Sequence, residues 1–443
     1  MGAPPVDPEA YDVAVVGAGI AGATLCVYLR RAGLRVVCLD REPYPHSKVG
    51  ESLDWSSPWL LQTVGLSASS LLEAQVATPK LKIAVCESGR RTWQAAPPPA
   101  IRRSPMRFET ATLHVDRAAL DQRVYEQAVA SGAEFFWERV TRLETEGDRI
   151  TACVTSSGRR FNARWYVDAS GTARFFTRAL NIPIVEYGRQ KVCLWTYFDT
   201  PPLDSGTTFF LDADAEYLHW LWDIPISPHR TSVGLVVAAE TVKRQRQRGL
   251  SNEEILTAEL AQYPRFTGLL ASHGGSDVHA TSFQPYVTSR VCGPNWLMIG
   301  EAAAMPDPLT GNGVTSGMRH ARFAAAALAR AGEEREIRPG DRRKFTRHVH
   351  RLGHSFNAHI ERVIYNNPIR RGLGMYPATL IYTLFAFFMN ALYTRFDPDG
   401  PVAMAVFDGL FVIARTWVAF WSGVARVALF VRRRPAGTDT QEA

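Results

Sequence analysis

The sequence predicts a mixed α/β fold, in which a Rossmann-type domain is interleaved with an antiparallel sheet and followed by a helical, hydrophobic C-terminal region. The first forty residues alternate strand, glycine turn, helix and strand, short alternating runs fill residues 190–238, and the chain beyond residue 313 is mostly helical. The predicted domains are 10–185 joined with 280–330, then 186–279, then 331–434, and a flexible tail at 435–443.

Composition restricts the class of protein. With 443 residues, of which 46% are hydrophobic, the chain can bury large cores and is neither disordered nor fibrous. The net charge of +7 does not predict a nucleic-acid partner, because the basic stretches at 335–351 and 432–434 lack interleaved stacking aromatics. The six cysteines are scattered without a CxxC, and no basic and apolar leader begins the sequence, so we expect a reducing, cytoplasmic setting.

The first predicted unit is a glycine-rich turn between a strand and a helix. Gly17, Gly19 and Gly22 form a GxGxxG pattern, and Asp40 ends the next strand, "LRVVCLD". The first glycine allows the tight turn, the second lets the backbone approach a pyrophosphate, and the third lets helix and strand pack closely. The helix N-terminus then faces the phosphates, and the carboxylate accepts hydrogen bonds from ribose hydroxyls. The spacing predicts a dinucleotide site, for either NAD or FAD.

Two later segments favour FAD over NAD. "WYVDASG" is an apolar strand that ends in Asp168, and "WLMIGEAAAMPDPLTGNG" is a strand that ends in Gly300 and Glu301 and leads into a glycine-rich helix start. A carboxylate at a strand tip can bind the ribityl hydroxyls of a flavin, and a helix N-terminus can stabilise negative charge on the reduced ring.

With these motifs the chain resembles the FAD-dependent enzymes built like para-hydroxybenzoate hydroxylase, over about residues 10 to 330. That family includes aromatic monooxygenases, geranylgeranyl reductases and flavin-dependent halogenases. One departure is visible, since the family usually has Asp where this chain has Glu301. The resemblance implies that FAD is bound by Gly17, Gly19, Gly22, Asp40, Arg41, Gly50, Glu51, Ser52, Arg117, Asp168, Gly300, Glu301, Pro308, Gly311, Asn312 and Gly313.

The stretch "KVGESLDWSSPWL", residues 48–60, is expected to leave the dinucleotide unit and run alongside the flavin. Gly50 allows close backbone approach there, and Glu51 and Ser52 can meet the polar edge of the cofactor. Family members often have Pro soon after this acid, whereas here Asp54 and Trp55 intervene. The tryptophans of this stretch are the part specific to this chain.

Two features are similar to flavin-dependent halogenases. The WxWxIP signature of these enzymes is matched by Trp220, Trp222 and Pro225. The resemblance implies that these residues screen the flavin from the substrate. Alternating aromatic residues on a sheet also arise from core packing alone. Lys80 lies 29 residues after Glu51, where halogenases have the lysine that receives hypohalite and delivers the halogen. Burial between apolar residues lowers the pKa of a lysine and suits a nucleophilic amine. A solvated, structural lysine is the alternative at this position.

The loop "MPDPLTGNG" does not match the halogenase pattern. Halogenases usually show Phe, Pro and Ser-x-Gly here, whereas this chain has Met305 and Gly311, and Thr310 stands where tryptophan halogenases have a catalytic Glu. The loop is closer to that of monooxygenases and geranylgeranyl reductases, although the backbone amides of Asn312 and Gly313 can still bind chloride or bromide. Halogenation is the leading hypothesis, and hydroxylation or epoxidation without halide and prenyl-chain reduction stay open.

No second strand, turn and helix fingerprint for NADPH is present, because Gly311-x-Gly313 follows a loop. Electrons are therefore expected from a transient NAD(P)H encounter or from a separate flavin reductase. The resemblance implies that O2 then reacts with the reduced flavin to a C4a-hydroperoxide. We expect the substrate to be a hydrophobic or aromatic secondary metabolite, free, lipid-like or tethered to a carrier.

The C-terminal region carries four histidines, His348, His350, His354 and His359, on a strongly basic predicted helix. No carboxylate or cysteine joins them in a ligand spacing, so we predict no metal and a solvated or phosphate-facing helix. No GxSxG hydrolase elbow is present either.

Residues 372–394 form an uncharged run of 23, and a second apolar segment, 402–431, ends in "RRRP". Such segments are compatible with a helical lid over an apolar pocket or with association with a membrane surface. Pro377 and Asn390 weaken a true transmembrane span, so we prefer lid or surface association.

Overall fold

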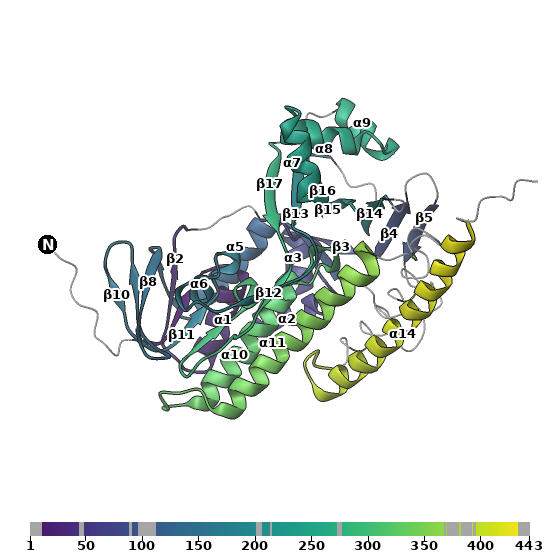
Figure 1. The fold of residues 1–443 in the computed structure, drawn as a ribbon. Coiled ribbons are helices and arrows are strands. Elements are labelled where there is room, and N and C mark those ends of the chain that lie inside the picture. The colour runs from purple at the N-terminus through teal and green to yellow at the C-terminus, as the bar shows by residue number, and fades with distance from the viewer. Residues whose placement is uncertain are drawn as a thin grey trace, which may run out of the picture.

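A central parallel sheet organises the N-terminal domain of the computed structural model (Figure 1). The model describes residues 11–43, 48–87, 91–95, 112–200, 206–212, 215–272, 277–366 and 396–432, with Ile369, Ile381 and Leu392. The strand order is β19 (Trp296–Met298), β11 (Ala163–Asp168), β1 (Tyr11–Val16), β2 (Val36–Asp40) and β7 (Glu134–Trp137), all parallel. Val16 pairs with Asp168 and Val13 with Val36. This arrangement confirms the predicted Rossmann-type domain.

The central strands of this sheet, β1 and β2, are mostly apolar, because a parallel sheet is covered on both faces. All six residues of β1 are buried. Helix α1 (Ile20–Arg31) packs against both α5 (Arg117–Ala130) and α10 (Gly313–Ala331). Asp116 caps α5 by accepting a hydrogen bond from the amide of Ala119 at 3.1 Å.

The second large element is a seven-stranded sheet. Its order is β17 (His279–Phe283), β13 (Lys191–Phe198), β16 (Arg230–Ala238), β15 (Trp220–Ser227), β14 (Gly206–Leu211), β4 (Lys82–Glu87) and β5 (Arg91–Ala95). Neighbours are antiparallel except β14 and β4. The sheet takes in β4 and β5, which the sequence places with residues 10–185, because β4 pairs with β14 across the domain boundary.

Three helices cover one face of this sheet, at the top of Figure 1. They are α7 (Ala239–Gln247), α8 (Asn252–Leu260) and α9 (Pro264–Ser272). Ser251 and Glu254 form a capping box at the start of α8.

Smaller elements complete the domain. Two three-stranded sheets join β10 (Arg160–Phe161), β9 (Arg149–Thr155) and β8 (Val140–Glu146), and β12 (Ile184–Glu186), β18 (Tyr286–Thr288) and β20 (Ala304–Met305). A two-stranded ribbon pairs β3 (Ala77–Lys80) with β6 (Thr112–Val115). The short helices are α2 (Ser57–Thr63), α3 (Ala68–Glu73), α6 (Phe175–Ala179), η1 (Gly171–Ala173), η2 (Gly300–Ala302) and η3 (Pro308–Thr310).

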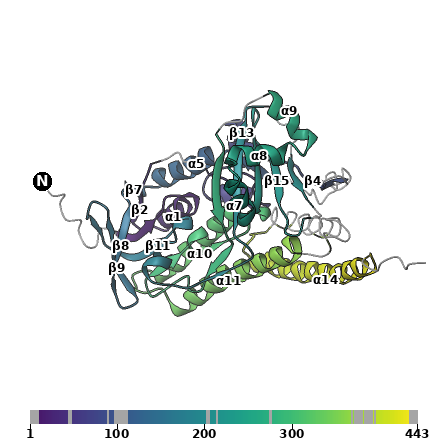
Figure 2. The same ribbon diagram turned by 45° about the horizontal axis from the view of Figure 1, so that its top comes forward.

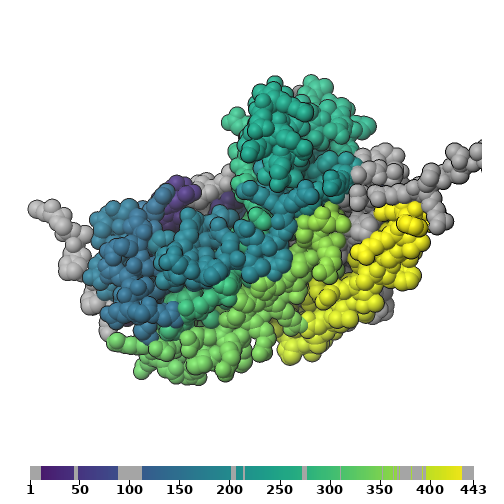
Figure 3. Space-filling view, viewed as in Figure 1, coloured from purple at the N-terminus to yellow at the C-terminus, as the bar shows by residue number. Residues whose placement is uncertain are grey.

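The C-terminal region is helical, as predicted. Helix α11 (Pro339–Ile360) continues into a single π-helical turn, η4 (Glu361–Tyr365), and α14 (Pro401–Arg432) follows (Figure 2). Figure 3 shows α14 on the outside of the molecule, at one edge. The apolar run at 372–394 lies outside the described residues apart from Ile381 and Leu392, and so does the tail at 435–443.

The prediction of a solvated histidine helix is wrong for two residues of α11. His348 and His359 are buried, at 7% and 9% exposure, and burial lowers the pKa of His348 to about 3 and that of His359 to about 4. His348 stacks on Phe323 of α10. Its helix packs on α10 with this face inward, which the basic composition of the segment conceals. Within the described ranges, the structure contains no group of three or more histidines, cysteines or carboxylates able to hold a metal.

Candidate active site

The glycine turn after β1 is built too tightly for side chains. Gly17 has a φ of +106°, and a Cβ there would lie 2.4 Å from the carbonyl oxygen of Ala169. A Cβ at Gly22 would lie 2.0 Å from the carbonyl oxygen of Gly17. At Gly19 a Cβ would meet only the Nζ of Lys48, at 3.3 Å, and α1 begins there without a side-chain cap. The turn therefore presents backbone at a helix N-terminus, with the flexible end of Lys48 above Gly19.

Asp40 lies beside this turn, where the sequence predicts the ribose carboxylate. Its Oδ2 accepts a hydrogen bond from the amide of Ala18 at 2.6 Å, and its Oδ1 accepts one from the amide of Arg41 at 2.6 Å. Asp40 is half-buried and Arg41 is exposed. The carboxylate thus shapes the turn from the end of β2 and remains within reach of a nucleotide.

Asp168 ends β11 next to the same turn but is fully buried. Its oxygens accept hydrogen bonds from the amides of Ser170 at 2.9 Å and Phe176 at 2.7 Å. Burial raises the pKa of this carboxyl group. In the structure Asp168 holds the "DASG" turn, and its predicted contact with FAD stays a prediction.

Glu301 follows Gly300 at the end of β19, and Gly300 has a φ of +58°. The Glu301 side chain is half-buried, and burial raises its pKa while the charges of Arg117 and Lys48 act in the opposite direction. The substitution of the usual Asp by Glu therefore leaves an acid between two cations, at the tip of a strand that neighbours β11.

Residues 48–55, which we call the strap, cross between the two domains. Gly50 has a φ of +111°, and a Cβ there would lie 2.7 Å from Nη1 of Arg117. Arg117 donates to the carbonyl oxygens of Val49 at 3.1 Å and Gly50 at 3.4 Å, and it is fixed by an ion pair with Asp121 at 3.1 Å. The predicted cofactor-binding arginine is thus first an anchor for the strap.

Glu51 turns its carboxylate toward the seven-stranded sheet. It accepts hydrogen bonds from the amide of Gly50 at 2.9 Å and from the hydroxyls of Tyr197 and Ser232, both at 3.2 Å. Burial raises the pKa of Glu51. Ser52 shares a hydrogen bond of 2.9 Å with Thr207 of β14. Both side chains tie the strap to the sheet, and their predicted contacts with the cofactor stay predictions.

The loop before α10 packs directly on the strap. Pro308 begins η3, and Gly311 ends it with a φ of +64°, where a Cβ would lie 2.7 Å from the carbonyl oxygen of Ser52. This contact leaves no room for a side chain at residue 311. Asn312 precedes α10 without a side-chain cap, and Thr315 in the first turn donates to Oδ2 of Asp54 at 2.5 Å. The start of α10, with Gly313, is therefore fixed against the strap.

Lys80 lies at the end of β3 under the same strap. It is 6% exposed, its Nζ donates to the carbonyl oxygen of Leu53 at 3.0 Å, and the ammonium lies 5.5 Å from the ring centre of Trp55. Burial lowers the pKa of Lys80 to about 8, although Asp54 nearby raises it. The Lys80 side chain is therefore not solvated, and a structural role stays the alternative to halogen transfer. Lys82, by contrast, is half-buried on β4.

His114 is a neighbour of Lys80 that sequence reasoning missed. Antiparallel pairing of β3 with β6 puts both side chains on one face of the ribbon. The Nε2 of His114 shares a hydrogen bond of 2.8 Å with Thr207, and burial, reinforced by the charge of Lys80, lowers its pKa well below the usual range. No local pattern marks His114, because its proximity to Lys80 depends on the pairing of β3 with β6.

The signature tryptophans lie on β15, each 3% exposed, with ring centres 5.8 Å apart. The indole of Trp222 donates to Ser232 at 3.0 Å, and that of Trp220 donates to Tyr365 at 3.0 Å. The carbonyl oxygen of Pro225 accepts a hydrogen bond from Thr78 of β3 at 2.5 Å. The core-packing interpretation is confirmed for both rings, and a screening role toward the flavin stays a prediction. Pro225 connects the signature to the strand that carries Lys80.

Comparison with known proteins identifies the family. The model of the FAD binding domain family matches residues 10–336. A tryptophan 2-halogenase of Chondromyces crocatus is 27% identical over 331 residues, which cover 72% of this chain and 61% of the relative, so the chain spans less than two thirds of that protein's length. A 1H-pyrrole-2-carbonyl-[peptidyl-carrier protein] brominase of Pseudoalteromonas luteoviolacea is 24% identical over 340 residues, which cover 73% of this chain and 78% of the relative. The solved structure of the flavin-dependent brominase Bmp2 has the same fold, with a TM-score of 0.67 and 21% identity over 96% of this chain and 99% of that one.

Proposed function

We propose, from the premise that the chain belongs to the FAD binding domain family and is a FAD-dependent oxidoreductase, that it is a flavin-dependent halogenase-like enzyme of hydrophobic or aromatic metabolites. The observation that carries the proposal is Lys80, a buried lysine with a lowered pKa beneath the strap. The tryptophan halogenase and the carrier-protein brominase, which are 27% and 24% identical to this chain over the aligned residues, support it.

The residues of the nucleotide turn fit FAD. The backbone at Gly19 and the first amides of α1 suit a pyrophosphate, and Asp40 suits an adenosine ribose. The start of α10, which also lacks a side-chain cap, suits the electron-rich end of a reduced flavin or a halide anion. When bound, FAD supplies the electrons with which O2 is activated, and these electrons come from NAD(P)H directly or through a separate flavin reductase.

Lys80 then receives the oxidised halogen. Its neutral amine attacks the halogen of hypohalous acid, so that an N–halogen bond forms, the O–halogen bond breaks, and the leaving oxygen takes the amine proton and departs as water. The N–halogen bond then breaks as the halogen passes to an electron-rich carbon of the substrate, and the proton that this carbon loses restores the neutral amine of Lys80. With the pKa lowered to about 8, roughly 10% of Lys80 is neutral at pH 7, compared with roughly 0.03% for an ordinary lysine.

The test uses purified protein loaded with FAD, together with a flavin reductase, NADH, O2, bromide and an aromatic substrate panel. In Lys80→Met we expect unchanged FAD binding and a loss of brominated product of more than about 100-fold, as for other residues that form covalent intermediates. Lys82→Met is the matched control, because it removes a half-buried lysine two residues away and keeps the product. Oxygenated product that ignores bromide and survives Lys80→Met would instead identify a hydroxylase or epoxidase.

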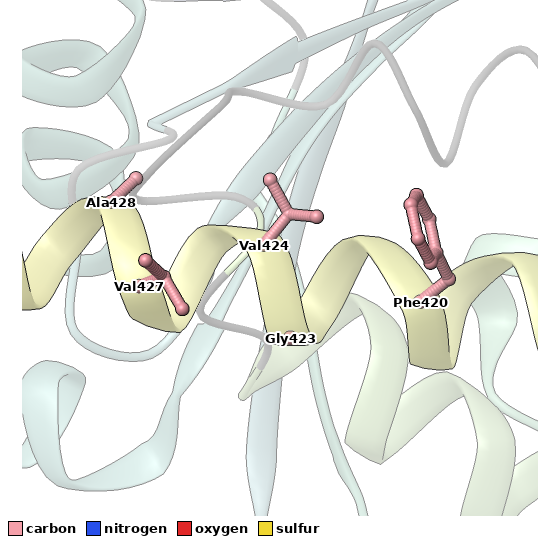
Figure 4. A pocket seen from close by; sticks show the side chains of 5 residues that line it. All are labelled: Phe420, Gly423, Val424, Val427 and Ala428. Carbon is pink, nitrogen blue, oxygen red and sulfur yellow. The ribbon is translucent and has the colours of Figure 1, made fainter.

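We further propose that the enzyme acts in the cytoplasm at a membrane surface, with α14 on the lipid headgroups. Residues Pro401–Val431 are the one stretch of the described chain long and apolar enough to cross a membrane, and only 17% of their most apolar window is buried. Phe420, Val427 and Phe430 are 63%, 64% and 64% exposed. An apolar hollow of about 520 Å³ lies on this helix, lined by Phe420, Gly423, Val424, Val427 and Ala428. Figure 4 shows these residues along the helix.

The other face of α14 supports the lid interpretation. Ala414, Val418 and Ala425 belong to the buried cluster that contains Trp220 and Trp222, while Ala403 packs with Trp55. One helix can therefore cover the apolar cluster and present its outer face to lipid, from which a hydrophobic substrate would enter. Acidic vesicles floated in a density gradient test this: the protein should float with them, and Phe420→Ser with Val427→Ser should stay at the bottom. Equal sedimentation of both proteins would reject membrane association.

A further inference from the structure

Lys191 opens β13 and is a cation without contact with solvent. Its side chain is 0% exposed. Burial of a lysine is rare and costly unless its charge is compensated. The proposed reaction makes no use of this residue, and sequence reasoning did not select it.

Two carboxylates and three aromatic rings surround its ammonium group. The Nζ lies 3.3 Å from Oδ2 of Asp307 and 3.8 Å from Oε2 of Glu361. It also lies 4.2 Å from the ring centre of Tyr365 and 5.8 Å from those of Tyr217 and Phe283. The nearest of these groups, Asp307, belongs to the loop that leads into α10. Lys191 thus joins the seven-stranded sheet to that loop.

The same carboxylate is held from a second direction. Oδ1 of Asp307 accepts hydrogen bonds from the hydroxyl of Tyr365 at 3.1 Å and from the amide of Leu309 at 3.1 Å. Tyr365 lies in the π-helical turn η4, and its hydroxyl accepts the indole hydrogen bond of Trp220 at 3.0 Å. Asp307, Tyr365 and Trp220 are 3%, 0% and 3% exposed, so solvent does not weaken these bonds.

The backbone of the loop is fixed as well. The amide of Asp307 donates to Oδ1 of Asn357 at 3.2 Å, and Nδ2 of Asn357 donates to the carbonyl oxygen of Met305 at 3.0 Å. Elements far apart in sequence therefore meet at one aspartate: β13, α11, η4 and, through Trp220, β15. Beyond Asp307 the loop meets the strap, where Gly311 lies against Ser52.

We propose that Lys191, Asp307 and Tyr365 form a loop clamp, a set of positioning residues that sets residues 305–313 and the start of α10 against the strap. Through Trp220 the clamp makes the position of this loop depend on the signature strand β15, which gives the first tryptophan of the signature a role besides packing. The inference rests on the FAD site of the proposed function, because the loop is the clamp's point of contact with the cofactor, but it does not depend on halide use.

Hydrogen exchange of the loop amides, followed by mass spectrometry in the protein without FAD or halide, tests the clamp. Tyr365→Phe removes one hydroxyl and keeps the ring, and Asp307→Asn removes the charge and keeps the size. We expect exchange in 305–313 to rise about three- to tenfold in each variant, the change that corresponds to one net hydrogen bond. FAD should bind more weakly by a similar factor, measured by quenching of flavin fluorescence.

Tyr166→Phe is the matched control, since the hydroxyl of Tyr166 also both donates, to Thr151 at 2.5 Å, and accepts, from the amide of Ala163 at 2.9 Å. It lies in β11, away from the loop, and should leave loop exchange unchanged. Equal exchange in wild type and both clamp variants, or an equal rise in Tyr166→Phe, would overturn the proposal. Adding Lys191→Met to Asp307→Asn should raise exchange little further, because the two residues act on the loop through one ion pair; a full second rise would show that they act independently and would also overturn the proposal. Loss of bromination alone, with these exchange results intact, would count only against the proposed function.

Discussion

Replacement of Lys80 should change the pH dependence of stability in a direction set by its burial. Burial lowers the folded-state pKa to about 8, whereas an unfolded lysine titrates near its ordinary value of 10.5. Between these two values the unfolded chain holds a proton that the folded chain has lost, so the free energy of unfolding of the wild type rises with pH. Below pH 8 both states are protonated, and the cost of the buried charge is fully present.

The magnitude follows from the two pKa values. At pH 7 the buried charge costs about 3 kcal/mol, and at pH 9.5 about 1.4 kcal/mol, so wild type gains about 2 kcal/mol relative to Lys80→Met over this range. At pH 7 itself the variant also loses the hydrogen bond to Leu53, worth about 1 to 3 kcal/mol to a charged donor, so the two proteins should be nearly equally stable there.

Urea unfolding at pH 7 and pH 9.5 measures this difference, with Lys82→Met as the control that should show no such change. A difference between wild type and Lys80→Met that is independent of pH would refute the argument, because it would mean that Lys80 is hydrated in the folded protein. The bromination rate should also rise about tenfold per pH unit below pH 8, because the fraction of neutral Lys80 rises by that factor.

Three further results are expected. Gly22→Ala should abolish FAD binding in a fluorescence titration, because its Cβ would lie 2.0 Å from the carbonyl oxygen of Gly17 and force the turn apart. Gly311→Ser, which introduces the residue usual in halogenases, should weaken FAD binding. The new side chain would stand at a φ of +64°, with its Cβ 2.7 Å from the carbonyl oxygen of Ser52. Tighter FAD binding would contradict the packing of the loop on the strap. Glu51→Gln should lower the free energy of unfolding by about 1 to 3 kcal/mol, measured in urea, because the NH2 group of Gln would face the N–H group of Gly50, and two donors cannot form a hydrogen bond. An unchanged free energy of unfolding would show that the carboxylate is protonated or turned away.

The strap shows how far local sequence reasoning reaches. The sequence predicts a close backbone approach at Gly50, and this residue has a φ of +111°, which favours glycine. The partners of Glu51 were not predicted, because Tyr197 and Ser232 come from strands more than 140 residues away. A carboxylate in a polar stretch gives no sign of whether it faces a cofactor or a neighbouring sheet.

The histidines of α11 and the seven-stranded sheet show the same limit. The basic composition of residues 335–351 predicts a solvated face, yet His348 is buried because α11 packs on α10 with that face inward. Likewise β4 and β5 precede the second domain in sequence, and only their pairing with β14 assigns them to its sheet.

The amino-acid sequence alone determined the Rossmann-type unit, the acid at the end of its second strand and the antiparallel sheet. Each of these depends on residues that are close along the chain, where steric limits and side-chain periodicity act directly. Tertiary structure decided that Lys80 is buried and that Glu51 faces the sheet. It also decided that Lys191, Asp307 and Tyr365 meet at one point. Desolvation and hydrogen bonding across long sequence separations exist only once the two domains and the C-terminal helices pack together.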